Sequence, residues 1–275
     1  MNAFSGFRGH NSSLRAANPL TDDQIARVAP SIFAEHKHGS RSDRYTVIPT
    51  IEVLTALRKE GFSPFMVCQT KSRDEEKRGH AKHMIRMRHE SKIQNNQANE
   101  IILLNSHDGS SSYRMIAGVF RFVCSNGMVV GDIADDIRIR HSGDVIDNVI
   151  EGAFRVLDDF QLVDMHREAM QSLTLNVEEQ HAFAQSALTL KYDLDTAPAP
   201  ITTTDLLRPK RIEDQKTDLW TTFNRVQENI IKGGIRSRSK EGKVSTTREV
   251  KGIDQNIKLN RALWTLAEEM RKLKN

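Results

Sequence analysis

A change in the period of apolar residues along the chain most constrains the fold. Between residues 62 and 140, apolar residues fall in short runs bounded by turn signals, as in β-strands, whereas the flanking sequence keeps a helical spacing. His107-Asp108-Gly109-Ser110 and Asn126-Gly127 are two hairpin turn signals within this stretch. Consecutive strands with short polar links favour an antiparallel meander. We therefore predict an α+β fold: an antiparallel β-meander with N-terminal helices, followed by a mostly helical C-terminal part.

Local signals bound the expected elements. Thr21 and Gln24 form a capping-box pattern that opens a helix ending near Ala29. Thr50 is the expected cap of a second helix, which Gly61 ends. The expected strands are 62–73, 80–90, 100–107, 113–123, 128–130 and 136–140, and the later helices are 144–172, 176–192 (capped by Asn176), 212–232 and 253–272.

The pattern also suggests a domain organisation. Residues 1–19 are polar and rich in Gly, Asn and Ser, and are expected to be a flexible leader. An α+β domain covers 20–195, and the Pro/Ala/Thr-rich stretch 196–207 is a linker. Residues 208–275 form the helical C-terminal part, with a basic loop or hairpin at 234–252 that turns at Glu241-Gly242.

Composition excludes several classes of protein. No run of about 18 apolar residues exists, so no membrane partner is expected. The first residues lack the apolar segment of a signal peptide, which predicts a cytoplasmic location. The chain has only 2 cysteines in 275 residues, which is too few for a disulfide framework or a Cys-rich zinc site. No cofactor is expected.

The net charge of +4 hides a strong segregation of charge along the chain. Residues 1–131 carry +6, 132–195 carry −9, 196–207 carry −1 and 208–275 carry +8. Basic segments of this kind indicate a polyanionic partner. The alternative is that the acidic and basic segments pack against one another.

The C-terminal basic segment is the more coherent of two cation clusters. Gly234–Gly252 holds six bases, with serine and threonine residues between them. Cations bind phosphates by releasing counterions, and hydroxyl groups add hydrogen bonds without reading the base sequence. We therefore expect phosphate contacts from Arg236, Arg238, Lys240 and Lys243.

The second cluster lies at 71–92, which contains eight basic and four acidic residues. Arg86 and Arg88 alternate on one expected strand, so they share a face with their guanidinium groups about 7 Å apart. Both are candidate phosphate contacts. The alternative is an ordinary solvated sheet face.

Signatures of catalysis and of metal binding are weak. The chain lacks the phosphate loop, the dinucleotide-binding glycine pattern, H-E-x-x-H and G-x-S-x-G. Five of its histidines are His36, His38, His80, His83 and His89. The spacing of His36 and His38 could bring two imidazoles together across a loop or on one strand face, whereas His80 and His83 would point to opposite faces of a strand. Solvated or phosphate-contacting histidines are the favoured interpretation. No catalytic residue is therefore assigned, and no metal site is expected.

Several motifs resemble those of a known family. They include Tyr45–Thr50, Lys82–Met84, Phe120–Gly127 and Leu219–Asn229, and the likeness extends from about Tyr45 to the final helix. Together they resemble the phage/plasmid-like family called domain of unknown function 932. The resemblance implies a role in the DNA metabolism of prophages, plasmids or other mobile elements, and it implies no catalytic residues.

The sequence therefore predicts a nucleic-acid-binding accessory protein of a mobile element that favours single-stranded DNA and assists its annealing or protection through phosphate contacts. Self-association into a homo-oligomer is expected for such a role. Two alternatives stay open. One is a divalent-metal-dependent nuclease or nucleotide-processing enzyme that uses dispersed aspartates and histidines. The other is an inhibitor or adaptor that binds a host protein.

Overall fold

The structure, a computed structural model, describes residues 11–36, 39, 49–70, 75–94, 97–122, 126–131, 137–139, 145–238 and 244–274. The chain divides into two compact units. Unit 1 comprises Met1–Gly118 and Asp136–Asp158, and unit 2 comprises Val119–Asp135 and Asp159–Asn275. Residues 196–207, which were expected to link two domains, lie inside unit 2.

The first half of the chain holds most of the strands and three short helices. Its elements are β1 (Asn11–Arg15), α1 (Asp22–Val28), η1 (Pro30–Phe33), α2 (Thr50–Lys59), β2 (Phe62–Thr70), α3 (Glu75–Arg78), β3 (His83–His89), η2 (Glu90–Lys92), β4 (Ile93–Gln94), β5 (Gln97–Asn105), β6 (Tyr113–Arg121), β7 (Asn126–Val129) and β8 (Ile137–Ile139). The long helix α4 (Val145–Ser172) begins in unit 1 and ends in unit 2.

The strands form an antiparallel sheet, as predicted. Its order is β1-β2-β3-β5-β6-β7, with β4 paired to β5 and β8 paired to β6. Residues directly opposite each other on paired strands lie on the same face, so the register brings Cys68, Met84 and Leu104 into one row across β2, β3 and β5. The α+β prediction is confirmed: strands dominate the N-terminal half, and helices follow.

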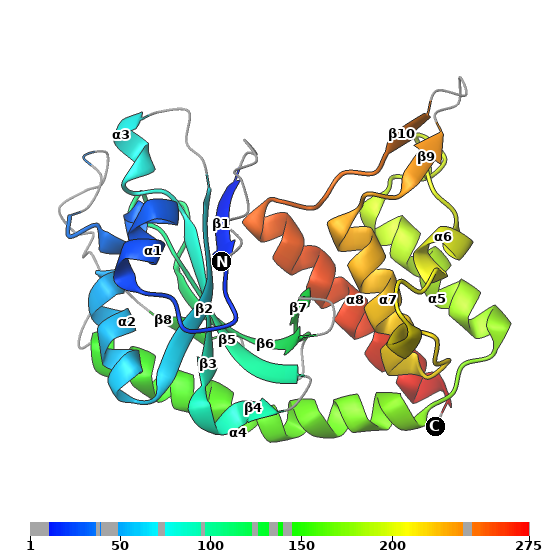
Figure 1. Cartoon of the computed structure of the whole chain (residues 1–275), viewed down its shortest axis with the longest axis horizontal. Helices are drawn as coiled ribbons and strands as arrows, with labels where there is room; N and C mark the ends of the chain where they lie inside the picture. The colour runs from blue at the N-terminus through cyan, green and yellow to red at the C-terminus, as the bar shows by residue number, and fades with distance from the viewer. Residues whose placement is uncertain are drawn as a thin grey trace. The chain divides into compact units, whose positions relative to one another are not determined.

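Helices cover β2 in unit 1. Figure 1 shows α1 and α2 beside β2, and both helices contact this strand. Helix α2 buries Val53, Leu54 and Leu57. On α4, Phe154 packs edge-on against Phe62, with ring centroids 5.7 Å apart. These contacts place the apolar core of unit 1 between the helices and the sheet.

Two of the predicted helix caps are confirmed, and one differs. Both capping boxes are present, at Thr21 before α1 and at Asn176 before α5 (Val177–Lys191). At α2 the N-cap is Pro49, not Thr50. The Thr50 hydroxyl instead lies 2.9 Å from Nε2 of His83, which is a long-range contact that helix signals cannot show.

Part of the expected flexible leader, residues 1–19, forms a β-strand. Residues 1–10 lie outside the described residues, but Asn11–Arg15 forms β1 and pairs with β2, from Asn11 opposite Thr70 to Arg15 opposite Met66. An edge strand offers a row of backbone donors and acceptors to any extended segment. Pairing of this kind depends on the backbone, so polar composition does not forbid it.

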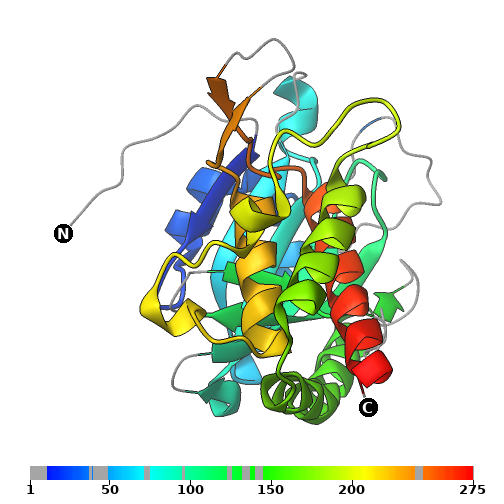
Figure 2. The ribbon, with the colours of Figure 1, turned by 90° about the vertical axis from the view of Figure 1, so that its right-hand side faces the viewer.

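Unit 2 contains a group of helices. They are the end of α4, then α5, α6 (Thr203–Leu207), η3 (Ile212–Asp214), α7 (Leu219–Lys232) and α8 (Ile253–Lys274). In Figure 2, α5, α7 and α8 run side by side, and each contacts the other two. Their core is aromatic: Trp220 and Phe223, which were expected in the core, pack with Trp264 at centroid distances of 5.6–6.0 Å.

The helix expected over 212–232 begins later in the structure. Ile212–Asp214 is a separate 3-10 turn, and α7 starts after Asp218, whose carboxylate accepts a hydrogen bond from the Thr221 backbone at 2.8 Å. The Asp218 cap satisfies an end-of-helix N–H that would otherwise have no partner.

A short hairpin follows α7. Its strands are β9 (Arg236–Arg238) and β10 (Val244–Thr246), which pair antiparallel. In Figure 1 the hairpin extends away from the end of α7. The expected basic loop or hairpin thus takes the hairpin form. Among the described residues, no helix combines the length and the apolar character needed to cross a membrane.

Candidate functional site

The polar face of α7 is unusual because it is buried. Every residue from Leu219 to Ile231 is buried, including seven with polar or charged side chains. Several of these side chains bind neighbouring elements. Asn229 donates to the backbone oxygens of Leu206 and Arg208, and Gln227 donates to Asn260 on α8. The helix therefore organises unit 2 through hydrogen bonds as well as through its aromatic core.

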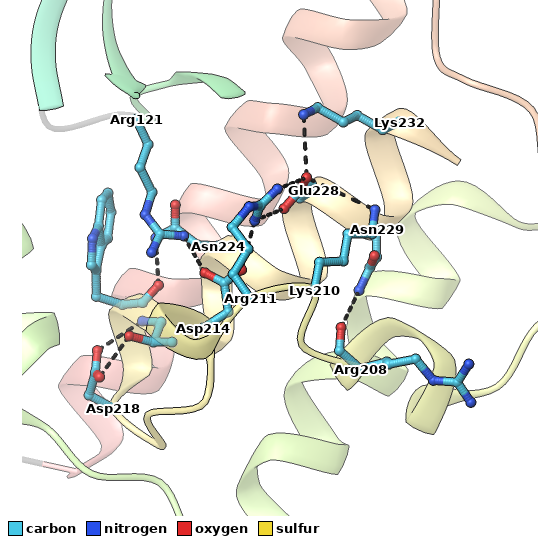
Figure 3. Close-up of polar contacts among 12 residues, drawn as sticks. Arg121, Arg208, Lys210, Arg211, Asp214, Asp218, Asn224, Glu228, Asn229 and Lys232 are labelled. Carbon is cyan, nitrogen blue, oxygen red and sulfur yellow. Dashed lines mark hydrogen bonds and ion pairs between the residues drawn. The ribbon is translucent and has the colours of Figure 1, made fainter. Parts of the chain in front are cut away.

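Glu228 is the centre of a cationic cluster on this helix. Its Oε1 lies 2.7 Å from Arg211, 3.3 Å from Lys232 and 4.0 Å from Lys210. Arg211 also donates to Oε2 at 2.8 Å, which makes the arginine contact bidentate. Figure 3 shows the three cations around this carboxylate. Asn229 helps to position Lys210, because its bonds to the Leu206 and Arg208 backbone fix the segment before Lys210 against α7.

A second carboxylate extends the cluster. Asp214 accepts from Arg211 at 2.7 Å and from Arg121, at the end of β6, at 2.6 Å. Arg211 therefore bridges the two acids. The six side chains of the cluster, which we call the Glu228 cluster, are Arg121, Lys210, Arg211, Asp214, Glu228 and Lys232, and they carry a formal charge of +2.

Burial and hydrogen bonding together shift the pKa values of Glu228 and Arg211 in directions that favour their charged forms. Burial alone would raise the pKa of Glu228, but the hydrogen bonds from Arg211 and the nearby Lys232 and Lys210 outweigh it, so the pKa is lowered. The same hydrogen bonds raise the pKa of Arg211 above its ordinary value. The two carboxylates face cations, so the surplus charge of the cluster suits an anionic ligand.

The base of the hairpin is tied to α5 and α7. The Lys191 ammonium donates to the backbone oxygen of Ile230 at 2.6 Å and approaches that of Arg248 at 3.3 Å. Gly234 N–H donates to the Thr247 oxygen at 2.8 Å, and Val250 N–H donates to that of Ile231 at 2.8 Å. These bonds give the hairpin a defined point of departure from unit 2.

Of the four predicted C-terminal cations, two lie within the described residues, both on β9. Arg236 is exposed on β9, opposite Thr246. The backbone of Arg238 pairs with Val244, but its side chain lies outside the described residues. Lys240 and Lys243 also lie outside them. The predicted segment is therefore a basic hairpin whose strand residues Arg236 and Val244–Thr246 are exposed to solvent.

Arg86 and Arg88 are not exposed to solvent, although both the predicted phosphate contact and the alternative of an ordinary solvated sheet face require exposure. They do share one face of β3, but both are buried, at 2% and 1% exposure. Glu100 on β5 receives both guanidinium groups, at 2.5 Å from Arg86 and 2.9 Å from Arg88. Arg88 also lies over the Phe65 ring at 4.2 Å. Burial with an internal carboxylate removes the exposure that a phosphate contact needs, so we do not retain these two arginines as candidates.

Within the described residues, His, Cys, Asp and Glu side chains form no group of three or more that could hold a metal ion. Two of the predicted histidines have defined partners. His83 is buried between the hydroxyls of Ser31 and Thr50, and His89 lies 3.0 Å from the Glu60 oxygen. His38 lies outside the described residues.

Sequence reasoning missed the Glu228 cluster. Part of its signal was local, because Glu228 and Lys232 are four residues apart on one helix and Arg211 and Asp214 are three apart. The decisive contact, between Arg211 and Glu228, joins residues 17 apart across a turn. It depends on how the segment before α7 folds back, which no spacing rule reveals.

Comparisons with known proteins agree on one family. The family described as "Domain of unknown function (DUF932)" matches residues 37–264. The chain is 50% identical over 262 residues to the UPF0380 protein YfjQ and 51% identical over 262 residues to the UPF0380 protein YafZ, both of Escherichia coli (strain K12), with 95% of each chain covered. No solved structure matches.

Proposed function

This chain belongs to the DUF932 family, and from its basic hairpin we propose that it binds nucleic acid through backbone phosphates, with single-stranded DNA as the favoured ligand. One observation carries the proposal: β9 and β10 present Arg236 and hydroxyl-bearing residues to solvent on a ribbon whose base is fixed to α5 and α7. A fixed ribbon with cations and hydroxyls suits phosphate contacts, which give affinity without sequence reading.

The neighbouring Glu228 cluster supports the same ligand class. Lys232 is the last residue of α7, and only three residues separate it from Arg236 at the start of β9. The hairpin and the cluster are therefore continuous along the chain, and both belong to unit 2. The resemblance of the motifs to a phage/plasmid-like family supports a further part of the proposal, that the protein serves the DNA metabolism of a mobile element. Self-association along a strand belongs to the same proposal, because an annealing protein must present many sites to one strand.

The test is binding of fluorescently labelled single-stranded and duplex DNA over a series of salt concentrations, with and without Mg²⁺. Affinity for single strands should fall steeply with salt, because each phosphate contact contributes about −0.7 to the slope of log K against log[salt]. Absence of binding at low salt contradicts the proposal. Degradation of the DNA only when Mg²⁺ is present would favour the nuclease alternative.

A charge reversal locates the contact. The double variant R236E/R238E should bind several-fold more weakly and with a shallower salt slope, and by a similar factor for unrelated sequences. The matched control is K258E/K272E, which makes the same change of net charge at two exposed lysines of α8. If R236E/R238E and K258E/K272E weaken binding equally, the effect is one of net charge and the hairpin is not the contact.

A further inference from the structure

Two exposed lysines, Lys210 and Lys232, lie close to the buried carboxylate of Glu228. Its side chain is 5% exposed, whereas those of Lys210 and Lys232 are 39% and 37% exposed. The carboxylate is therefore buried, whereas the two lysine side chains reach solvent, and Figure 3 shows both ammonium groups directed at this carboxylate. Both ammonium nitrogens approach the same Oε1 atom, so their separation cannot exceed the sum of those two distances.

Glu228 does not use the hydrogen-bonding capacity of Lys210. At 4.0 Å the Lys210 nitrogen is too far from Glu228 for a hydrogen bond. Within the described residues its ammonium has no hydrogen-bond partner, although it can donate three bonds. Glu228 thus holds Lys210 nearby by charge and leaves its donors for another acceptor.

We propose that Lys210 and Lys232 together bind one phosphodiester group of the nucleic-acid strand, and that Glu228 is an internal counter-charge that positions them and limits the affinity. The proposal rests on the proposed function. Two charge-assisted bonds of about 2.8 Å, one to each non-bridging oxygen, span the separation of the two ammonium groups. Arg211 stays bidentate to Glu228 and keeps the carboxylate in place.

The position of the two lysines fits a strand that also contacts the hairpin. Arg236 follows Lys232 by four residues, which span at most about 14 Å of extended chain. A few nucleotides of single strand cover that distance. The Glu228 cluster would then supply one phosphate contact in addition to those of the hairpin.

The counter-charge role makes an unusual prediction. The variant E228Q keeps the size of the side chain and an oxygen that accepts from Arg211, but it removes the negative charge beneath the lysines. It should bind a labelled oligonucleotide roughly three- to tenfold more tightly at low salt, because a like charge facing the phosphate is lost. The matched control is E269Q, which makes the same change of charge at an exposed ion pair of α8.

The lysines themselves give the opposite test. K210A should weaken oligonucleotide binding, and K210A/K232A should lower the salt slope by about 0.7, the value for one phosphate contact on a single strand. The control is K272A on α8. Lys210 is exposed and has no hydrogen bond to lose within the described part of the chain, so K210A tests the site even if E228Q fails to fold.

A second readout separates this proposal from the proposed function. Inorganic pyrophosphate should raise the melting temperature of the wild-type protein, and the increase should shrink in K210A/K232A but not in K272A. If oligonucleotides bind and respond to R236E/R238E but not to K210A/K232A, the phosphate site is overturned and the proposed function stands. If pyrophosphate acts through the lysines but no oligonucleotide binds, the proposed function and the strand assignment are overturned together. If E228Q binds no more tightly than E269Q, Glu228 is not a counter-charge.

Discussion

His83 is a buried imidazole with a partner at each ring nitrogen. Nδ1 lies 2.8 Å from the Ser31 hydroxyl and Nε2 lies 2.9 Å from the Thr50 hydroxyl. Asn105 donates to the same Thr50 oxygen at 3.0 Å. Burial lowers the pKa of His83 from 6.5 to about 3, with nearby His107 adding to the effect and the Ala81 carbonyl and Asp108 opposing it. The folded protein therefore holds this side chain neutral.

Acid should destabilise unit 1 through this residue. Below pH 6.5 the unfolded chain binds a proton at His83 that the folded chain does not bind until about pH 3. The free energy of unfolding should therefore decrease as the pH is lowered from about 6.5 to about 3, by up to about 1.4 kcal/mol per pH unit. Urea unfolding of wild type and H83Q at several pH values below neutral measures this slope, and H83Q should have the shallower one. H36Q, at an exposed histidine, is the control. Equal slopes for H83Q and wild type would contradict the prediction.

The roles of some residues could not be predicted from the sequence, because their partners lie far away along the chain. The hydroxyl of Thr50 was predicted to cap its own helix, but its partner His83 lies 33 positions away. Arg86 and Arg88 were correctly expected to share a strand face, yet both are buried and pair with Glu100 on the neighbouring strand β5. Strand alternation predicts which residues share a face. It does not predict what covers that face.

At the scale of elements, the hairpin base depends on two consecutive glycines in left-handed conformations. Gly233 has φ +63° and Gly234 has φ +74°. A Cβ atom on Gly233 would lie 2.7 Å from the Thr247 oxygen and from the Arg248 carbonyl carbon, whereas one on Gly234 would have no atom within 4 Å. Only the first glycine is required by packing as well as by conformation.

The two alanine variants should therefore differ. G234A should lose about 1 kcal/mol of stability from backbone strain alone. G233A should lose more, in total about 2–4 kcal/mol, because β10 must also move away from the end of α7. Urea unfolding gives the difference, and faster hydrogen exchange at the Thr247 amide, which donates to the Ile235 oxygen, should locate it at the hairpin base. Similar losses in both variants would mean that this close approach has no energetic weight.

Elements were predicted best where their signals are local. The capping boxes at Thr21 and Asn176 satisfy helix ends with residues three positions away, so sequence shows them directly. The start of α7 was placed too early, because Ile212–Asp214 continues the apolar spacing but belongs to a separate turn. The strand Asn11–Arg15 was missed, since its stability comes from backbone pairing with β2.

For the whole molecule, folding packs acidic and basic segments together that are separate in the sequence. Unit 2 contains 20 Lys and Arg residues against 19 Asp and Glu residues, although 208–275 alone carries +8. The compensating acids come largely from 159–195, which has 7 acids and 2 bases. Helix α5 from that segment packs on α7 and α8, and Glu179 pairs with Lys274 at 2.7 Å. Packing of acidic on basic segments, an alternative that the sequence left open, thus occurs within unit 2. Affinity for a polyanion must then arise from local surfaces such as the hairpin.

Unit 2 is also discontinuous in sequence, because residues 119–135 join the helices that come after 159. Gly131 marks the contact. A Cβ atom there would lie 2.9 Å from Cδ1 of Trp264 and 3.0 Å from Oγ1 of Thr265, both on α8. The indole is itself fully buried, so it has little freedom to move aside.

G131A should therefore destabilise unit 2 by about 1–3 kcal/mol through overpacking. The control is G79A, since a Cβ atom on Gly79 meets nothing within 4 Å. Alanine also loses less chain entropy on folding than glycine does, so no loss of stability is expected in this variant. Urea unfolding followed by circular dichroism measures both variants, although Gly79 lies in unit 1. Tryptophan fluorescence then assigns the loss in G131A to unit 2, because both tryptophans, Trp220 and Trp264, lie there. If G131A is as stable as G79A, then Gly131 does not pack closely on α8.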